Sequence, residues 1–183
     1  MLDLNEMADY IFSRFTRDLF RLEVLPHYDV ASDDQDYHRY LRGDGEPNAA
    51  EKEPWLEELR ADTAAGKQWR RVHALHHPLS DYLRYECEWG YVYNVAAGEQ
   101  VRILDLDALN LGAFERQISD FFVIDHQHVV RSWYDDDYRF SHAELIEEPG
   151  PYLALADVVW STAEPFTTWW ARNSQYHRGA QAA

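Results

Sequence analysis

Cysteine, basic residues and long apolar runs are scarce in this chain of 183 residues, and each shortage excludes a class of protein. Cys87 is the only cysteine, so no disulfide can form within the chain, which suits a reducing compartment. Lysine and arginine number 17 against 33 acidic residues, which gives a formal net charge of −16. Free nucleic acid is therefore excluded as a direct partner by default, because its phosphates would meet a repulsive field.

The N-terminal sequence and the hydropathy pattern indicate a location in the cytoplasm. No segment approaches the roughly 20 consecutive apolar residues of a membrane-spanning helix. The first residues, MLDLNEMADYIF, are acidic where a secretory signal would be basic, and they contain no apolar run. We therefore expect a cytoplasmic protein that binds no membrane. A basic protein surface would suit so acidic a chain, although acidity also serves solubility.

Hydrophobic residues make up 46% of the chain and aromatic residues 15%, which is enough for a sizeable core. We expect a single domain over residues 1–173, followed by a flexible tail over residues 174–183. The stretch GDGEPNAAEKE, from Gly43 onward, is typical of a loop or linker. An N-terminal subdomain over residues 1–65 is therefore the alternative division.

The first third of the chain predicts three helices and one strand. Residues 19–25 alternate apolar and charged side chains, which is typical of a half-buried strand. The apolar spacing and the capping residues predict helices over residues 4–16 after Asp3, over 32–42 starting with the N-cap Ser32, and over 54–65 before Gly66.

The remainder predicts strands at 69–76 and 100–106, a helix over 79–89 capped by Ser80, and an antiparallel meander within 120–147. A last aromatic-rich segment, 152–171, is expected to be helical with a break at Pro165. The expected fold class is α+β, with a mixed sheet of five or six strands, flanking helices and a C-terminal aromatic-rich helix.

Residues 66–104 gather more charged and hydrogen-bonding side chains than a plain core unit needs. The arginines of this segment would suit an anionic or planar ligand if they lie at the carboxyl end of the sheet. We expect the ligand-binding residues to be Arg71, Asp81, Tyr82, Arg84, Glu86, Glu99 and Arg102. The alternative is an internal arginine–carboxylate network that fixes helix to sheet.

Other motifs carry weaker signals, and no metal, cofactor or catalytic residue is assigned. The spacings H-x-x-H-H (His73, His76, His77) and H-x-H (His126, His128) lack further ligands, so structural or surface histidines are expected. The run 135–137 of aspartates lacks the glycine and distal glutamate of a calcium loop. Cys87 stands between two glutamates, which raise a thiol pKa and disfavour a nucleophile.

Aromatic residues near the C-terminus allow two interpretations. Phe166, Trp169 and Trp170, together with Trp160, would form an exposed patch for a partner, or they would pack the last helix against the sheet. We expect packing.

Several strings resemble one family of small actinobacterial proteins of unknown function: WRRVHALHHPLSDYLRYE, NVAAGEQVRIL, DFFVID, VVRSWYDDD and FRLEVLPHYDV. The resemblance covers roughly residues 15 to 165. Members are often encoded beside helix-turn-helix regulators, so the resemblance implies a regulatory or accessory role. The order of elements is also similar to one half of a phospholipase D-type domain. That family's His-x-Lys motif is missing here, where residues 117–120 read QISD, which implies that its phosphodiesterase chemistry is absent.

The leading functional expectation is a non-catalytic binding module with a regulatory role in the cytosol. It would bind a small polar or anionic ligand or dock on a helix-turn-helix regulator. A small enzyme using Asp81, Glu86 and Glu99 as general acid and base is the first alternative. The second is an acidic antagonist of a nucleic-acid-binding regulator.

Overall fold

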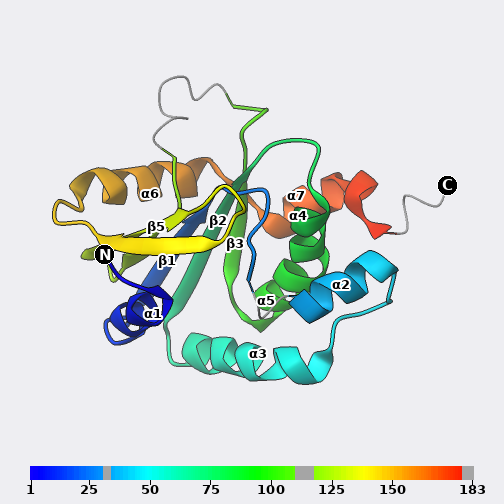
Figure 1. The fold of residues 1–183 in the computed structure, drawn as a ribbon, viewed down its shortest axis with the longest axis horizontal. Helices are drawn as coiled ribbons and strands as arrows, with labels where there is room; N and C mark the ends of the chain where they lie inside the picture. Colours follow the sequence, from blue (N-terminus) through cyan, green and yellow to red (C-terminus); the bar gives the residue numbers. More distant parts are fainter. Residues whose placement is uncertain (31–33, 110–117, 179–183) are drawn as a thin grey trace.

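A mixed seven-stranded sheet runs through the middle of the molecule (Figure 1), in the order β6-β5-β4-β1-β2-β3-β7. The computed structural model describes residues 1–30, 34–109 and 118–178. The strands are β1 (Asp18–Glu23), β2 (Gln68–Leu75), β3 (Gln100–Asp105), β4 (Phe121–Ile124), β5 (His128–Tyr134), β6 (Phe140–Leu145) and β7 (Glu164–Pro165). The prediction of five or six strands misses β7, because two residues are too few to show an alternating pattern.

Strands β1, β2 and β3 are parallel and form the centre of the sheet. On the other side of β1, the predicted meander β4-β5-β6 continues the sheet with antiparallel pairing. The interpretation of β1 as a half-buried strand is wrong, since Glu23 is only 2% exposed. Strand β1 lies between two neighbours and is covered on both faces, so even its charged residues are drawn into the interior.

Helices cover both faces of the sheet (Figure 1). Helix α6 (Gly150–Thr162) packs on one face, against Phe20, Val72 and Phe121 among others. The opposite face carries the remaining longer helices. These are α1 (Leu4–Phe12), α3 (Ala49–Ala64), the continuous segment α4 (Asp81–Tyr85), η1 (Glu86–Tyr91) and α5 (Val92–Ala97), and then α7 (Phe166–Arg172). Helix α2 (Asp34–Arg42) packs on α4 through aromatic side chains.

Local capping explains where three of the described helices, α1, α3 and α4, begin. Asp3 and Glu6 form the reciprocal capping box at the start of α1, and the Ser80 side chain accepts a hydrogen bond from the backbone of Leu83 at the start of α4. The predicted start of α3 at residue 54 is wrong, because Asn48 caps the helix and it begins at Ala49. The helix therefore extends into the stretch predicted as a linker. The serine predicted to cap α2 lies outside the described residues.

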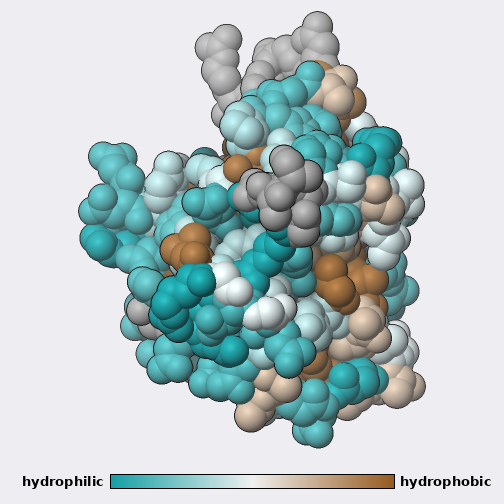
Figure 2. Space-filling model, turned by 90° about the vertical axis from the view of Figure 1, so that its right-hand side faces the viewer, coloured by the Kyte–Doolittle hydropathy of each residue, from teal (hydrophilic) through white to brown (hydrophobic). Residues whose placement is uncertain are grey.

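The C-terminal aromatic residues pack inward, as expected. Trp169 is fully buried and Phe166 is 2% exposed, and both lie against β3 residues Val101 and Ile103. Residues Ser174–Tyr176, inside the predicted tail, form a short 3-10 helix, η3. Within the described part of the chain, no helix is both long and apolar enough to cross a membrane. Hydrophilic residues cover most of the side shown in Figure 2, and hydrophobic ones form small separate patches.

Candidate functional site

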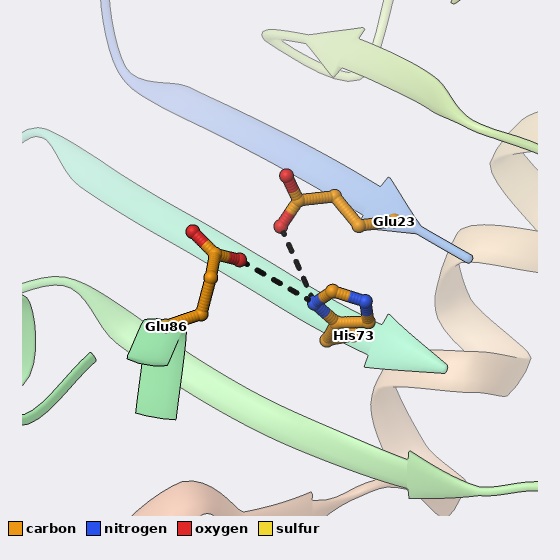
Figure 3. Close-up of side chains that lie close together, drawn as sticks. All are labelled: Glu23, His73 and Glu86. Atoms are coloured by element: carbon orange, nitrogen blue, oxygen red, sulfur yellow. Dashed lines mark ion pairs between the residues drawn. The ribbon is translucent and has the colours of Figure 1, made fainter. Parts of the chain in front are cut away.

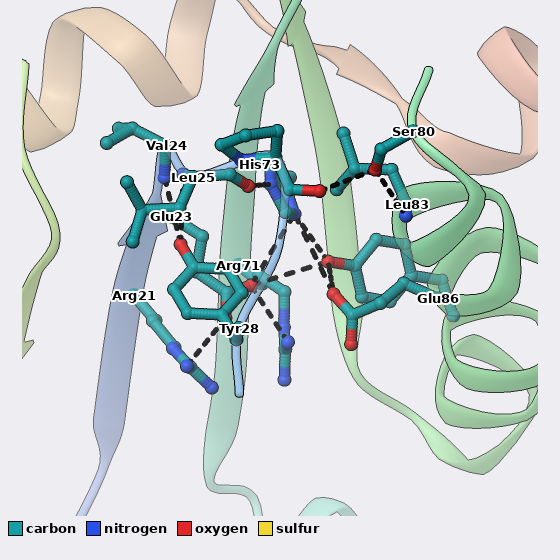
Figure 4. Close-up of polar contacts among 12 residues, drawn as sticks. Arg21, Glu23, Val24, Leu25, Tyr28, Arg71, His73, Ser80, Leu83 and Glu86 are labelled. Atoms are coloured by element: carbon teal, nitrogen blue, oxygen red, sulfur yellow. Dashed lines mark hydrogen bonds and ion pairs between the residues drawn. The ribbon is translucent and has the colours of Figure 1, made fainter. Parts of the chain in front are cut away.

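Four polar side chains of β1 and β2 point to the same face of the sheet, beneath the helical segment 81–97 (Figure 4). Parallel pairing sets Arg21 beside Arg71 and Glu23 beside His73. Residues two apart on a strand share a face, so the pairing generates a compact square of two arginines, a glutamate and a histidine. The sequence places this square near the carboxyl ends of adjacent parallel strands, where α/β units commonly bind ligands.

An arginine–carboxylate network occupies one side of the square. Arg71 donates from Nη1 to Oε2 of Glu23 at 2.9 Å and from Nε to Oε1 of Glu99 at 2.8 Å. The other oxygen of Glu23 lies 2.6 Å from Nη2 of Arg21. Asn94 donates to Oε2 of Glu99 at 2.8 Å and accepts from the indole nitrogen of Trp55 at 3.2 Å. The network thus continues from the sheet to α5 and α3.

The charged groups of this network keep one another ionised. Burial alone would raise the pKa of Glu23, but the nearby positive charges of Arg21 and Arg71 outweigh it and lower that pKa to about 2. Burial opposes the charge on Arg71, yet Glu23 and Glu99 raise its pKa well above the usual value. Glu23 and Arg71 therefore remain ionised at any physiological pH.

A second chain of hydrogen bonds starts at His73, which is fully buried. Its Nε2 lies 3.1 Å from the carbonyl oxygen of Leu25, and its Nδ1 lies 2.6 Å from the hydroxyl of Tyr91. The same hydroxyl lies 2.7 Å from Oε2 of Glu86. Glu86 and Tyr91 are five residues apart, and α-helical geometry would turn them away from each other. The π-helical turn η1 has the wider i to i+5 repeat, and it brings them together.

The donors and acceptors of this chain of hydrogen bonds require one additional proton. A carbonyl oxygen only accepts, so Nε2 of His73 carries a proton toward Leu25. Each of the two short contacts of the Tyr91 hydroxyl needs a proton, and the hydroxyl supplies one. The other must reside on Nδ1 of His73 or on the carboxyl group of Glu86. The cluster therefore holds one proton more than a neutral imidazole, a phenol and a carboxylate would carry.

The surrounding charges agree with this count. Among the groups joined directly by these contacts, two guanidinium groups, Arg21 and Arg71, face three carboxyl groups, Glu23, Glu86 and Glu99, which favours a proton on one of the carboxyl groups. Burial lowers the pKa of His73, with Glu23 opposing it, which disfavours an imidazolium. The additional proton accordingly lies on the Glu86–Tyr91 side of the chain.

Glu23, His73 and Glu86 each offer one ligand atom to a common point, and these atoms lie within 4.8 Å of one another (Figure 3). Two contacts disfavour a metal ion there. The Tyr91 hydroxyl already touches all three ligand atoms, at 2.6, 2.7 and 3.4 Å. Arg71 also donates to the same Glu23 oxygen, so a divalent cation would adjoin a guanidinium group. The three groups fit proton sharing better than cation binding.

A cavity of about 310 Å³ opens beside these two networks. Its size is at the lower end of the range for small-molecule sites. Glu86 reaches it from η1, and Lys52 enters from α3 without an ion pair among the described residues. The lining residues are Arg21, Glu23, Tyr28, Val30, Lys52, Trp55, Arg71, Tyr82, Tyr85, Glu86, Gly90, Tyr91 and Asn94.

A buried tyrosine–aspartate pair supports the wall of this cavity. The hydroxyl of Tyr28 donates to Oδ2 of Asp120 at 2.6 Å, and the backbone amide of Val24 donates to Oδ1 at 3.2 Å. Burial raises the pKa of Asp120 to about 7, although the hydrogen bond from Tyr28 opposes the shift. Asp120 thus titrates near neutral pH directly behind a cavity residue.

The seven residues predicted as a ligand site divide into two groups. Arg71, Tyr82 and Glu86 line the cavity, and Glu99 holds Arg71 from behind. The other three lie elsewhere and do not converge with them. Asp81 and Arg84 pair with each other at 3.3 Å on α4, and Asp81 is largely exposed. Arg102 lies on the opposite face of the sheet, where it donates to backbone oxygens of α6 and its C-cap and stacks on Trp160.

Sequence reasoning missed Arg21, Glu23 and Tyr91 and treated His73 as structural. The alternating pattern predicts a solvent face for Arg21 and Glu23, whereas the central position of β1 places both under the helices. Tyr91 follows Glu86 by five residues, a spacing that signals proximity only in a π-helix. The other motifs remain without a site: Cys87 is 1% exposed with its thiol pKa raised by burial, and the run 135–137 lies in a turn.

Comparison with known families identifies the chain at the level of its family. A family model described as Domain of unknown function (DUF6879) matches residues 6–171. No curated protein matches the sequence. The match covers most of the chain, including every residue that lines the cavity. The protein therefore belongs to the DUF6879 family, whose function is unknown.

Proposed function

We propose that this protein is a non-catalytic module of the cytosol that binds a small polar ligand with an anionic group, in a regulatory role. The cavity of about 310 Å³ with Arg21 in its wall carries the proposal. Arg71 is held by two carboxylates and its side chain is 10% exposed, whereas Arg21 has one carboxylate partner and its side chain is 31% exposed. Arg21 therefore keeps guanidinium donors for an anion.

Lys52 provides a second positive charge in the same cavity. The hydroxyl and amide groups of the wall add hydrogen bonds that suit a polar ligand, and the buried network below them fixes the geometry before binding. The regulatory part of the proposal is supported by the family resemblance to proteins encoded beside helix-turn-helix regulators. Binding of the ligand in this cavity would then control the contact between the domain and such a regulator.

Retention of a small molecule by variants with an altered cavity tests the proposal. The protein, purified gently from its own host, is analysed by native mass spectrometry before and after denaturation. Wild type should retain an anionic small molecule that denaturation releases. Arg21→Gln removes the cation that Arg21 places in the cavity wall, and Gly90→Leu adds a side chain where a Cβ meets no atom within 4 Å. Both variants should lose the molecule.

Two controls match these changes. Arg172→Gln removes a surface arginine that pairs with Glu164 at 2.7 Å, close to the 2.6 Å of Arg21 and Glu23. Ala61→Leu enlarges an exposed side chain on α3. Both controls should retain the molecule. A wild-type protein without any bound molecule, or equal retention by Arg21→Gln and Arg172→Gln, contradicts the proposal.

Proton-transfer catalysis is the second candidate, because the additional proton reaches the cavity through Glu86. The predicted carboxylate set supports it less. Glu99 is held by Arg71 and Asn94, and Asp81 is exposed outside the cavity. Incubation of the retained molecule with wild type and with Glu86→Gln separates the candidates. Turnover by wild type alone indicates an enzyme, and an unchanged molecule indicates a binding module.

A further inference from the structure

A second, apolar cavity of about 180 Å³ adjoins the polar one. It lies between α1 and the sheet, and its walls include Ile11, Leu19 and Phe122. An engineered apolar cavity of about 150 Å³ is known to hold benzene, so this space is large enough for one ring or a short acyl chain. The apolar cavity can therefore hold an apolar group of that size.

Three side chains belong to the walls of both cavities: Arg21, Trp55 and Arg71. Trp55 donates its indole N–H to Asn94 on the polar side, while its ring meets Trp69 edge-on at 5.1 Å on the apolar side. The guanidinium of Arg21 pairs with Glu23 and lies 5.2 Å from the ring of Phe122. Both residues thus present polar groups to one cavity and apolar contacts to the other.

We infer that the ligand is an amphipathic anion, with its charged group at Arg21 in the polar cavity and an aromatic ring or short acyl group in the apolar cavity. This inference rests on the proposed function and specifies its ligand class. Arg71 is fixed by two carboxylates, but Arg21 is held by one and is the more exposed arginine of the shared wall. The ligand lies across Arg21, and its apolar group replaces water against Ile11, Leu19 and Phe122.

Straight-chain carboxylates are the probes that test the inference. Butyrate, hexanoate and octanoate are titrated into the full chain by calorimetry, with octanol as the uncharged counterpart. Burial of each additional methylene should tighten binding about fourfold until the apolar cavity is full. Amide chemical shifts of octanoate-bound protein should change at Ile11 and Phe122 as well as at Arg21.

Ala8→Leu provides the decisive variant, because Ala8 lines only the apolar cavity and leucine favours the helix α1. It should abolish the gain with chain length and therefore weaken octanoate binding far more than butyrate binding, whereas the control Ala61→Leu should behave like wild type. Equal affinities of wild type for butyrate and octanoate would overturn the inference and leave the polar site standing. Octanol binding as tightly as octanoate would overturn it too, because Arg21 would then contribute nothing. Failure of all carboxylates to bind would also overturn it, while the retained host molecule would still decide the proposed function.

Discussion

The hydroxyl oxygen of Tyr91 lies 2.6 Å from Nδ1 of His73 and joins that ring to Glu86 across the interior of the domain. Replacing Tyr91 with phenylalanine removes the hydroxyl and leaves a buried imidazole nitrogen without its partner. We expect a loss of about 2 kcal/mol in the free energy of unfolding. Urea denaturation followed by tryptophan fluorescence measures it. Stability equal to that of wild type would contradict the hydrogen-bonded chain.

The additional proton predicts that the protein tolerates glutamine in place of Glu86 but not in place of Glu23. Glutamine at position 86 is neutral and donates a hydrogen bond, like a protonated carboxyl group, so Glu86→Gln should change the free energy of unfolding by less than about 1 kcal/mol. Glu23→Gln removes the charge that Arg21 and Arg71 share, and should cost about 3 kcal/mol or more. Urea denaturation at pH 7 compares the two. Equal losses would show that Glu86 is ionised.

Asp120 predicts a specific pH dependence of stability. Burial, with Tyr28 opposing it, raises the pKa of this carboxyl group in the folded state to about 7. Folding therefore favours the protonated form. Its contribution is fully present below about pH 4 and is lost as the pH rises through 7. Relative to Asp120→Asn, wild type should lose on the order of 2–3 kcal/mol between pH 5 and pH 8. Parallel stability curves for the two proteins over that range would contradict the shift.

Removal of the buried charge of Arg71 should greatly reduce the free energy of unfolding. Arg71→Gln leaves Glu23 and Glu99 buried without their shared cation, which should cost about 3–5 kcal/mol. The surface control Arg172→Gln should cost less than about 1 kcal/mol, because its pair with Glu164 is exposed. Thermal and urea unfolding of both variants provide the measurement. Similarly small losses in the free energy of unfolding of both variants would show that the network contributes little to stability.

The burial of Cys87 predicts that its thiol reacts only after the protein unfolds. It is 1% exposed, and burial raises its pKa well above the usual value. A chromogenic disulfide reagent should label the folded protein no faster than the chain unfolds, and should label it at once in urea. Rapid labelling under native conditions would contradict the burial of the thiol.

Periodicity and capping identify most elements of the fold from the sequence. The segment around Ser80 carries a capping signal that is local in sequence, and the helix begins where predicted, although the helical segment continues to Ala97, beyond the predicted end at residue 89. The position of β1 in the sheet depends on pairing with β2 and β4, which are distant in sequence, so its alternating charges were assigned to solvent. Strand order is set by the sum of such contacts, and no local pattern encodes it.

The candidate site was only half predictable for the same reason. Local polar density pointed to Arg71 and Glu86, which do line the cavity. It also pointed to Arg102, because alternation along β3 alone does not say which face of the sheet meets which helix. Tyr91 required knowledge of the π-helical turn, whose extra residue leaves no distinct mark in the hydrophobic pattern.

The position of Arg21 has a kinetic consequence. The chain carries a formal net charge of −16, while the guanidinium groups of Arg21 and Arg71 are held inside the domain. An approaching anion is repelled at long range and attracted only once it has entered the cavity. Its capture should therefore accelerate as added salt screens the outer field. Molecules that bear several negative charges would be slowed most, so the proposed function predicts a preference for singly charged anions that arises from their rate of arrival, before any contact is made.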